Sequence, residues 1–374
     1  MNPPHSSTVP PSPDKTPEDR AASDAITAEG ASVASRELRY VDLAPPQPGK
    51  VVTVAPGVQW CRIPLPIDLD HINVWLVETD GGSVLVDTGM AVSVCMDAWE
   101  DVEREVFAVR PLRAIFITHI HPDHMGLVTW LQQRHNVPVW MSQRTYDQAL
   151  WILGGQAVAT PGEAETFFKA NGVAETASLQ PYFTTDRLAK MMSGMPQVER
   201  TVADGETLGW AGRSWRAMET NGHADGHLCL FDAAGDVLIS GDQVLPTISS
   251  NISLTWRNRD KNPLDSFLSS LRRLRQLPDE TLVLPSHGRP FRGLRHRIDD
   301  LLNHHEEQLS AIVQACAQAK TAAELLPFMY RRVLKGMHLL LALAEALAHL
   351  EYLVAGNRLE RGVDAQGVIR YRAC

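Results

Sequence analysis

Histidine and aspartate side chains come directly after short apolar runs in this chain, and this pattern restricts the possible folds more than any other feature. Residues 114–117 form one such run, and the next seven residues contain His119, His121, Asp123 and His124. A short run of this composition predicts a buried strand. The four polar side chains are therefore expected just beyond the carboxyl end of that strand.

Three more candidate ligands follow later predicted strands. They are His223 after residues 215–218, Asp242 after residues 237–240, and His287 after residues 281–284. In a layered α/β fold the carboxyl ends of the strands meet at one edge, where binding sites are usually built. We expect all seven side chains to converge there.

The remaining elements agree with an α/β order. Residues 73–77 and 83–86 predict a hairpin, residues 94–109 a helix, and Asn262 the cap of a helix that begins at Pro263. Between residues 142 and 200 the strand pattern stops, which predicts a helical insertion with a cap at Thr160.

Both ends of the chain differ from this middle part. Residues 1–38 are rich in Pro, Ser, Thr, Asp and Glu, which predicts a disordered tail. Residues 293–374 predict helices, one with a capping box at Thr321, followed by a terminal hairpin. This order suggests a small winged-helix-like module, separate from a catalytic domain at residues 39–292.

Composition excludes several classes of protein. The net charge of −9 argues against binding nucleic acid through the overall field, and five scattered cysteines fit neither a disulfide scaffold nor a thiolate zinc site. The start of the chain lacks the apolar core of a secretory signal. The apolar run 337–354 contains Glu345, His349 and Glu351, which predicts a buried or amphipathic helix. We expect a cytoplasmic protein without a membrane partner.

Imidazole nitrogens and carboxylate oxygens together favour zinc, with iron or manganese as alternatives. Two imidazoles on an extended loop can share one cation while the following residues turn toward another. The expected ligands of the first metal are His119, His121 and His223; those of the second are Asp123, His124 and His287, and Asp242 can bridge the two.

This set resembles the metallo-β-lactamase superfamily, whose members carry a His-x-His-x-Asp-His loop and later His, Asp and His ligands. The similarity covers roughly residues 50 to 292 and includes residues 86–89, 222–227 and 240–242. It implies a four-layer αββα sandwich. The C-terminal part resembles the winged-helix extension of the branch that includes β-lactamase-like protein 2, which implies hydrolysis or RNA cleavage.

Two residues near the ligands have supporting roles in this interpretation. Asp87 either forms a structural turn or hydrogen-bonds to a ligand, with equal weight. His227 is expected to support the site, because His223 already occupies the ligand position of its motif. The other histidines, including His71, are expected at the surface or in packing positions.

We expect a dinuclear hydrolase that uses a metal-bound hydroxide, with Asp123 as the catalytic residue that orients it and takes its proton. A thioester, ester or lactone of a small acyl compound is the favoured substrate, because the insertion offers an apolar lid over the site. Six cations could meet the phosphates of a coenzyme A-like group, although solvated surface is the commoner role for each: Lys169, Arg187, Lys190, Arg257, Arg259 and Lys261.

Other functions remain open at this point. An endoribonuclease or phosphodiesterase would use the same metals, but residues 292–374 contain eleven Lys and Arg against nine Asp and Glu, a weak charge for an RNA-binding module. That module is more consistent with a structural or homodimer contact. A mononuclear iron sulfur dioxygenase and a non-catalytic regulator are further alternatives, and the complete ligand set disfavours both.

Overall fold

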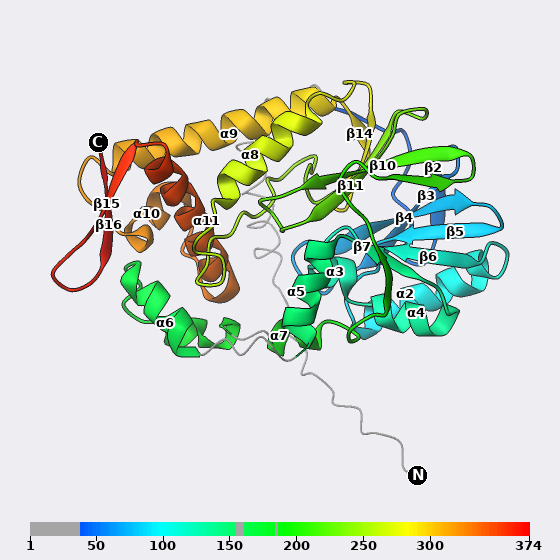
Figure 1. Ribbon diagram of the computed structural model, residues 1–374, viewed down its shortest axis with the longest axis horizontal. Coiled ribbons are helices and arrows are strands. Elements are labelled where there is room, and N and C mark those ends of the chain that lie inside the picture. Colours follow the sequence, from blue (N-terminus) through cyan, green and yellow to red (C-terminus); the bar gives the residue numbers. More distant parts are fainter. Residues whose placement is uncertain (1–37, 155–160, 184–185) are drawn as a thin grey trace, which may run out of the picture.

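The computed structural model describes residues 38–154, 161–183 and 186–374. The predicted tail at residues 1–38 lies outside these ranges except for Leu38, and so does the predicted cap Thr160. Figure 1 shows two facing sheets with helices on both outer sides. The expected four-layer αββα sandwich is therefore confirmed.

The first sheet has seven strands in the order β2-β3-β4-β5-β6-β7-β8. Their bounds are β2 Val51–Ala55, β3 Val58–Pro64, β4 His71–Thr79, β5 Gly82–Val86, β6 Leu112–Phe116, β7 Val139–Met141 and β8 Val198–Thr201. The predicted hairpin is β4 with β5, which pair antiparallel. β5, β6, β7 and β8 are parallel neighbours, so their carboxyl ends lie at one edge.

The second sheet also has seven strands, in the order β1-β14-β13-β12-β11-β10-β9. Their bounds are β1 Arg39–Tyr40, β9 Thr207–Trp210, β10 Arg213–Thr220, β11 His227–Asp232, β12 Val237–Gly241, β13 Leu282–Pro285 and β14 Phe291–Arg292. β12 and β13 are parallel, which brings the residues that follow them to a common edge.

β4 illustrates how the layers form. Ile72, Val74 and Leu76 pack in the core between the first sheet and its helices, whereas Trp75 and Val77 pack in the core between the two sheets. Successive side chains of a strand point to opposite faces, so a strand that is buried on both sides is apolar throughout. That double burial explains the continuous apolar run in the sequence.

Helices cover the outer faces. The first sheet is covered mainly by α2 Ser93–Val102, which continues as a π-helical turn at Glu103–Phe107, and by α3 Pro122–Met125 and α4 Val128–His135. The second sheet is covered by α8 Pro263–Leu274 and α9 Leu294–Ala315. The predicted cap of α8 is present, because the side chain of Asn262 accepts a hydrogen bond from the backbone N–H of Asp265.

The described residues between β7 and β8 form helices joined by turns and loops. The insertion contains α5 Gln143–Leu153, α6 Pro161–Ala170, the 3-10 helix η3 Ala177–Tyr182 and α7 Asp186–Lys190. Phe168 and Phe183 of this insertion pack with Leu340 and Leu343 in one buried cluster. These apolar side chains of the insertion therefore form a core that is shared with α11 (Gly336–Ala355).

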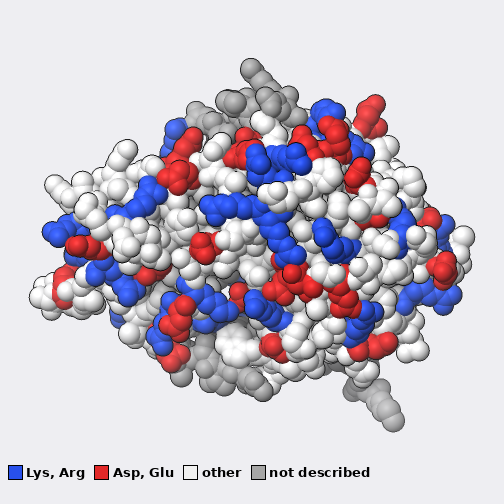
Figure 2. Space-filling view, turned by 45° about the horizontal axis from the view of Figure 1, so that its top comes forward, with Lys and Arg blue, Asp and Glu red and all other residues white. Residues whose placement is uncertain are grey.

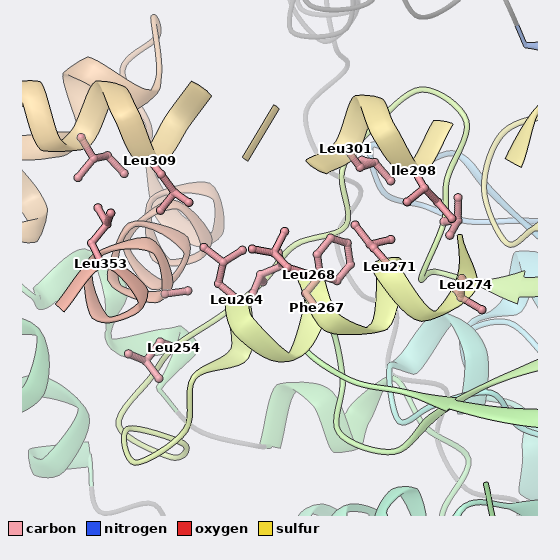
Figure 3. Close-up of a cluster of buried hydrophobic side chains, with 14 of the residues drawn as sticks. Leu254, Leu264, Phe267, Leu268, Leu271, Leu274, Ile298, Leu301, Leu309 and Leu353 are labelled. Carbon is pink, nitrogen blue, oxygen red and sulfur yellow. The ribbon is translucent and has the colours of Figure 1, made fainter. Parts of the chain in front are cut away.

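The C-terminal part contains α9, α10 Ala322–Met329, α11 Gly336–Ala355 and the hairpin of β15 Leu359–Val363 with β16 Ile369–Ala373. The capping box at Thr321 is present. α11 is long and apolar enough to cross a membrane, but it packs at the centre of the C-terminal helices, and core helices share that composition. In Figure 3, leucines of α8 face side chains of α9 and α11. The winged-helix comparison for this part remains a prediction.

Candidate metal centre

The loop after β6 presents four of the predicted ligands. β6 ends at Phe116, residues 117–121 form a loop with a bend at Ile120, and Pro122 begins the single-turn helix α3. Proline suits the first position of a helix because that position needs no N–H donor. The change from extended to helical backbone separates His119 and His121 from Asp123 and His124, as the sequence pattern predicted.

The first group of side chains contains His119, His121, His223 and Asp242, whose nearest potential ligand atoms all lie within 4.8 Å of one another. His119 Nε2 and His121 Nδ1 are 2.9 Å apart. His223 Nε2 is 3.3 Å from Asp242 Oδ2. Three imidazoles and one carboxylate form a donor set that suits zinc, iron or manganese.

The second group contains Asp123, His124 and His287, within the same 4.8 Å limit. Asp123 Oδ2 lies 3.3 Å from His287 Nε2 and 3.6 Å from His124 Nε2. The other oxygen of Asp242, Oδ1, lies 3.3 Å from His124 Nε2 and 3.6 Å from His287 Nε2. Asp242 therefore presents one oxygen to each group.

Several ligand atoms have no hydrogen-bond partner among the described residues although they are buried. These atoms are Nε2 of His124, His223 and His287, and Oδ1 of Asp242. A buried polar atom without a partner costs roughly 1–3 kcal/mol. Their convergence fits bound cations, which would satisfy all of these atoms at once.

The opposite ring nitrogen of each of these histidines is held by an acceptor. His124 Nδ1 donates to Asp87 Oδ2 over 2.7 Å, His287 Nδ1 to the His71 carbonyl over 2.8 Å, and His223 Nδ1 to the Asn251 carbonyl over 2.8 Å. These bonds assign the proton to Nδ1 and leave the Nε2 lone pair directed at the site.

Asp87 combines both of its predicted roles. Its backbone has φ +65°, a left-handed conformation that aspartate tolerates better than most residues. Its carboxylate accepts hydrogen bonds from the backbone N–H and the hydroxyl of Thr118, as well as from His124. Asp87 thus connects the end of β5 to the start of the ligand loop.

His227 lies beside the ligands but points both ring nitrogens at protein groups. Its Nε2 accepts the backbone N–H of Asp242 over 3.1 Å, and its Nδ1 lies 2.9 Å from the Thr220 hydroxyl. Gly241 has φ +52°, and a Cβ there would lie 2.3 Å from His227 Nε2. Glycine is therefore required for this close contact, through which His227 orients Asp242.

Burial and neighbouring charges shift the pKa values of the side chains in the two ligand groups in different directions. Burial, together with His223, lowers the pKa of His121 to about 3, so this imidazole is a neutral ligand. Burial also lowers the pKa of His124, but Asp242 and Asp123 outweigh it and raise that pKa well above its ordinary value. Burial opposes ionisation of Asp123, yet His124 and His287 lower its pKa to about 2. A cation would replace the proton that the carboxylates attract to His124.

Three supporting groups were missed by sequence reasoning. His71 was expected to be a surface or packing residue, but its carbonyl holds His287. The Asn251 carbonyl and Thr118 have comparable roles. Backbone acceptors leave no signal in the side-chain pattern, whereas Thr118 is adjacent to His119 and could have been considered.

Comparison with known proteins agrees with this geometry. The sequence profile of the Metallo-beta-lactamase superfamily matches residues 67–287, which is more than half of the chain and includes all seven candidate ligands. The chain belongs to this superfamily. A second profile, described as the metallo-beta-lactamase-like C-terminal domain, matches residues 309–374. The protein therefore combines the hydrolase fold with the C-terminal region expected from its sequence.

Among curated proteins, the chain is similar to the probable metallo-hydrolase YqjP of Bacillus subtilis strain 168, with 26% identity over 79% of this chain and 91% of that protein. It is also similar to the acyl-coenzyme A thioesterase MBLAC2 of Homo sapiens, with 25% identity over 63% of this chain and 79% of that protein. These relatives support a metallo-hydrolase and leave the substrate open.

Among solved structures, a beta-lactamase domain protein from Burkholderia ambifaria superposes with a TM-score of 0.84 at 35% identity, covering 92% of this chain and all of that one. A metallo-beta-lactamase family protein from Thermus thermophilus superposes with a TM-score of 0.73 at 28% identity, covering 86% of this chain and all of that one. The likeness extends beyond the residues of the first profile into the C-terminal region.

Proposed function

We propose that this superfamily member is a dinuclear metal-dependent hydrolase that cleaves thioesters. The observation that carries the proposal is the position of Asp242, whose two oxygens face two separate ligand groups. A single cation would leave one of these groups, with its buried unpaired nitrogens, unsatisfied. We propose zinc as the metal, with iron or manganese as alternatives.

Two bound cations would lower the pKa of a water molecule toward neutrality and polarise the scissile carbonyl. The protein contributes geometry and proton transfer. Asp123 is a carboxylate at neutral pH, because its neighbouring histidines lower its pKa to about 2. We assign Oδ2 of Asp123 the role of orienting the nucleophile and receiving its proton, since this oxygen lies between His287 and His124.

The thioester assignment is supported by the human relative, which is named an acyl-coenzyme A thioesterase. Phosphodiester cleavage of RNA receives less support. Figure 2 shows acidic and basic side chains intermingled on the displayed face instead of one broad basic surface. An RNA-binding protein usually gathers its Lys and Arg on one face.

The test measures metals per chain and then turnover of acyl-coenzyme A, lactone, glutathione thioester and RNA substrates. We expect about two metals, thioester turnover, and a loss of at least about 100-fold in kcat for Asp123→Ala. Asp80→Ala, an exposed aspartate in the β4–β5 turn, is the control. Full activity of Asp123→Ala, or one metal in a fully active protein, would contradict the proposed site.

A further inference from the structure

The short helix α7 of the insertion is fastened directly to the ligand loop. The residues that follow it make two backbone hydrogen bonds: Ala91 N donates to the Met191 carbonyl over 2.9 Å, and Ser193 N donates to the Gly126 carbonyl over 2.7 Å. Gly126 is only two residues beyond His124. The chain directly after Arg187 and Lys190 is therefore tied to the segment that follows His124.

A second segment, residues 256–261, is fastened near the first ligand group. Lys261 forms an ion pair with Asp225, and Gln148 donates to the Asp225 carbonyl over 2.8 Å. Asp225 is two residues beyond His223. The end of this segment is therefore tied to the loop that carries His223.

Arg257 in this segment is held in one orientation although it remains exposed. Its guanidinium lies over the rings of Trp256 and Trp151, with centroid distances of 4.5 and 5.3 Å. Its Nη2 donates to the Phe183 carbonyl over 3.0 Å. Contact with two indoles and one carbonyl fixes the plane of the guanidinium, so binding an anion would cost little further ordering.

The structure separates the six cations that the sequence proposed for phosphate binding. Lys169 is paired with Glu165, and Lys261 with Asp225. The other four, Arg187, Lys190, Arg257 and Arg259, form no ion pair with the carboxylates whose side chains are described. Arg259 lines a separate hollow with Phe167 and Leu347. We call Arg187, Lys190 and Arg257 the cationic rim.

Two members of the cationic rim contact consecutive residues. Arg187 lies 4.9 Å from the centroid of the Tyr182 ring, and Arg257 donates to the carbonyl of Phe183. The two guanidinium groups therefore border the same short stretch of the insertion. An anionic group with several oxygens could contact both of them.

We propose that the cationic rim binds the phosphate groups of the thiol carrier, so that the substrate is a coenzyme A thioester. This inference rests on the proposed thioester hydrolysis. Guanidinium groups match the spacing of phosphate oxygens and form charge-assisted hydrogen bonds. Because their segments are tied to residues near His124 and His223, a carrier phosphate bound at the rim would leave the thioester end free to reach the ligand groups.

The test compares two thioesters with the same acyl chain, one on coenzyme A and one on N-acetylcysteamine, which has no phosphate. We expect Arg257→Met to raise KM for the coenzyme A thioester about 10-fold or more, because a charged hydrogen bond is lost. Its KM for the short thioester should change less than twofold. Arg187→Met should act in the same direction, and the double variant more strongly.

The control is Arg272→Met. Arg272 is exposed and lies near the C-terminal end of α8, whereas residues 256–261 precede the start of that helix. A second readout is calorimetric titration with coenzyme A itself, which is expected to bind more weakly at higher salt and more weakly to Arg257→Met. Equal effects of Arg257→Met on both thioesters would make Arg257 a structural residue and overturn the inference.

The outcomes also separate this inference from the proposed function. If the protein hydrolyses a glutathione thioester faster than the coenzyme A thioester, the cationic rim would bind the carboxylates of glutathione, and the coenzyme A inference would be rejected. If the wild-type protein hydrolyses none of the three thioesters, the proposed function fails. The titration with coenzyme A still decides whether the cationic rim binds coenzyme A.

Discussion

Asp87 shows how much of the metal centre depends on one side chain that touches no metal. It joins the end of β5, the Thr118 backbone and the His124 ring through hydrogen bonds to a single carboxylate. A ligand histidine that loses such a partner is less basic and less well oriented. The position of His124 is therefore set by a residue 37 positions earlier in the chain.

We predict that Asp87→Asn lowers metal affinity about 10- to 100-fold with little change in fold. Asparagine tolerates the left-handed backbone of this position, so strain is not the cause. Competition with a chromophoric chelator measures the affinity, and circular dichroism checks the fold. Asp80→Asn is the control, and unchanged affinity in Asp87→Asn would contradict the assigned role.

Glu345 provides a pH-dependent contribution to stability. It is partly buried on α11, its pKa is raised by burial to about 7, and its Oε2 accepts a hydrogen bond from the Tyr330 hydroxyl over 3.0 Å. Between about pH 4.5 and pH 7 the unfolded chain releases this proton while the folded chain keeps it. The contribution of Glu345 to stability is therefore complete below pH 4.5 and is lost as the pH rises through 7.

Glu345→Gln removes this titration and keeps an acceptor for Tyr330. We predict that the free energy of unfolding of the variant, relative to wild type, rises by about 1–2 kcal/mol between about pH 5 and pH 8. This value is smaller than the full pKa shift would give, because Glu345 is partly exposed to solvent. Urea denaturation at both pH values measures it, with Glu360→Gln as the exposed control. Parallel pH profiles of wild type and Glu345→Gln would refute the prediction.

At the scale of elements, the C-terminal helices support the loop that carries the ligand contacts. Residues 243–254 follow Asp242 and include Asn251, which holds His223. Arg297 of α9 donates to the carbonyls of Leu245 and Ile248 over 2.6 and 2.9 Å, and Leu254 N donates to the Ala344 carbonyl of α11. The helices thus stabilise the loop that follows Asp242.

We predict that Arg297→Met lowers the free energy of unfolding by about 2–4 kcal/mol, because two buried carbonyls lose their donors. It should also weaken metal binding, since the loop that positions His223 and follows Asp242 loses support. Denaturation and chelator competition measure the two effects. Arg295→Met, on the same helix but bonded to Leu277 away from this loop, should change neither by more than a small amount.

At the scale of the whole molecule, one core joins the catalytic fold to the C-terminal region. The cluster in Figure 3 includes Phe231 of the second sheet, Leu264 of α8, Leu301 of α9, Leu353 of α11 and Tyr371 of β16. We predict a single calorimetric unfolding transition with a ratio of van't Hoff to calorimetric enthalpy near one. Two resolved transitions would show that the regions unfold separately, as the predicted boundary at residue 292 would allow.

Local sequence patterns were sufficient to predict several elements of the fold. The hairpin of β4 and β5, the cap of α8 and the capping box of α10 depend on neighbouring residues, and each was predicted correctly. The strands β7 and β8 were not predicted, because with three and four residues they are too short to show an alternation of apolar and polar side chains. Their strand conformation depends on pairing with β6 and with each other.

The sequence by itself determined which side chains could be ligands, because each follows a strand that its own apolar residues define. The four-layer sandwich followed from the family resemblance, whereas the apolar run of β4 by itself indicated only a strand covered on both faces. Asp242 was expected to bridge the two ligand groups, and the tertiary structure decided which of its oxygens faces which group. Only the tertiary structure showed that backbone carbonyls hold His223 and His287, and that Arg257 is fixed by two indoles and a carbonyl. These contacts join segments far apart in the chain, and their geometry exists only once the layers have packed.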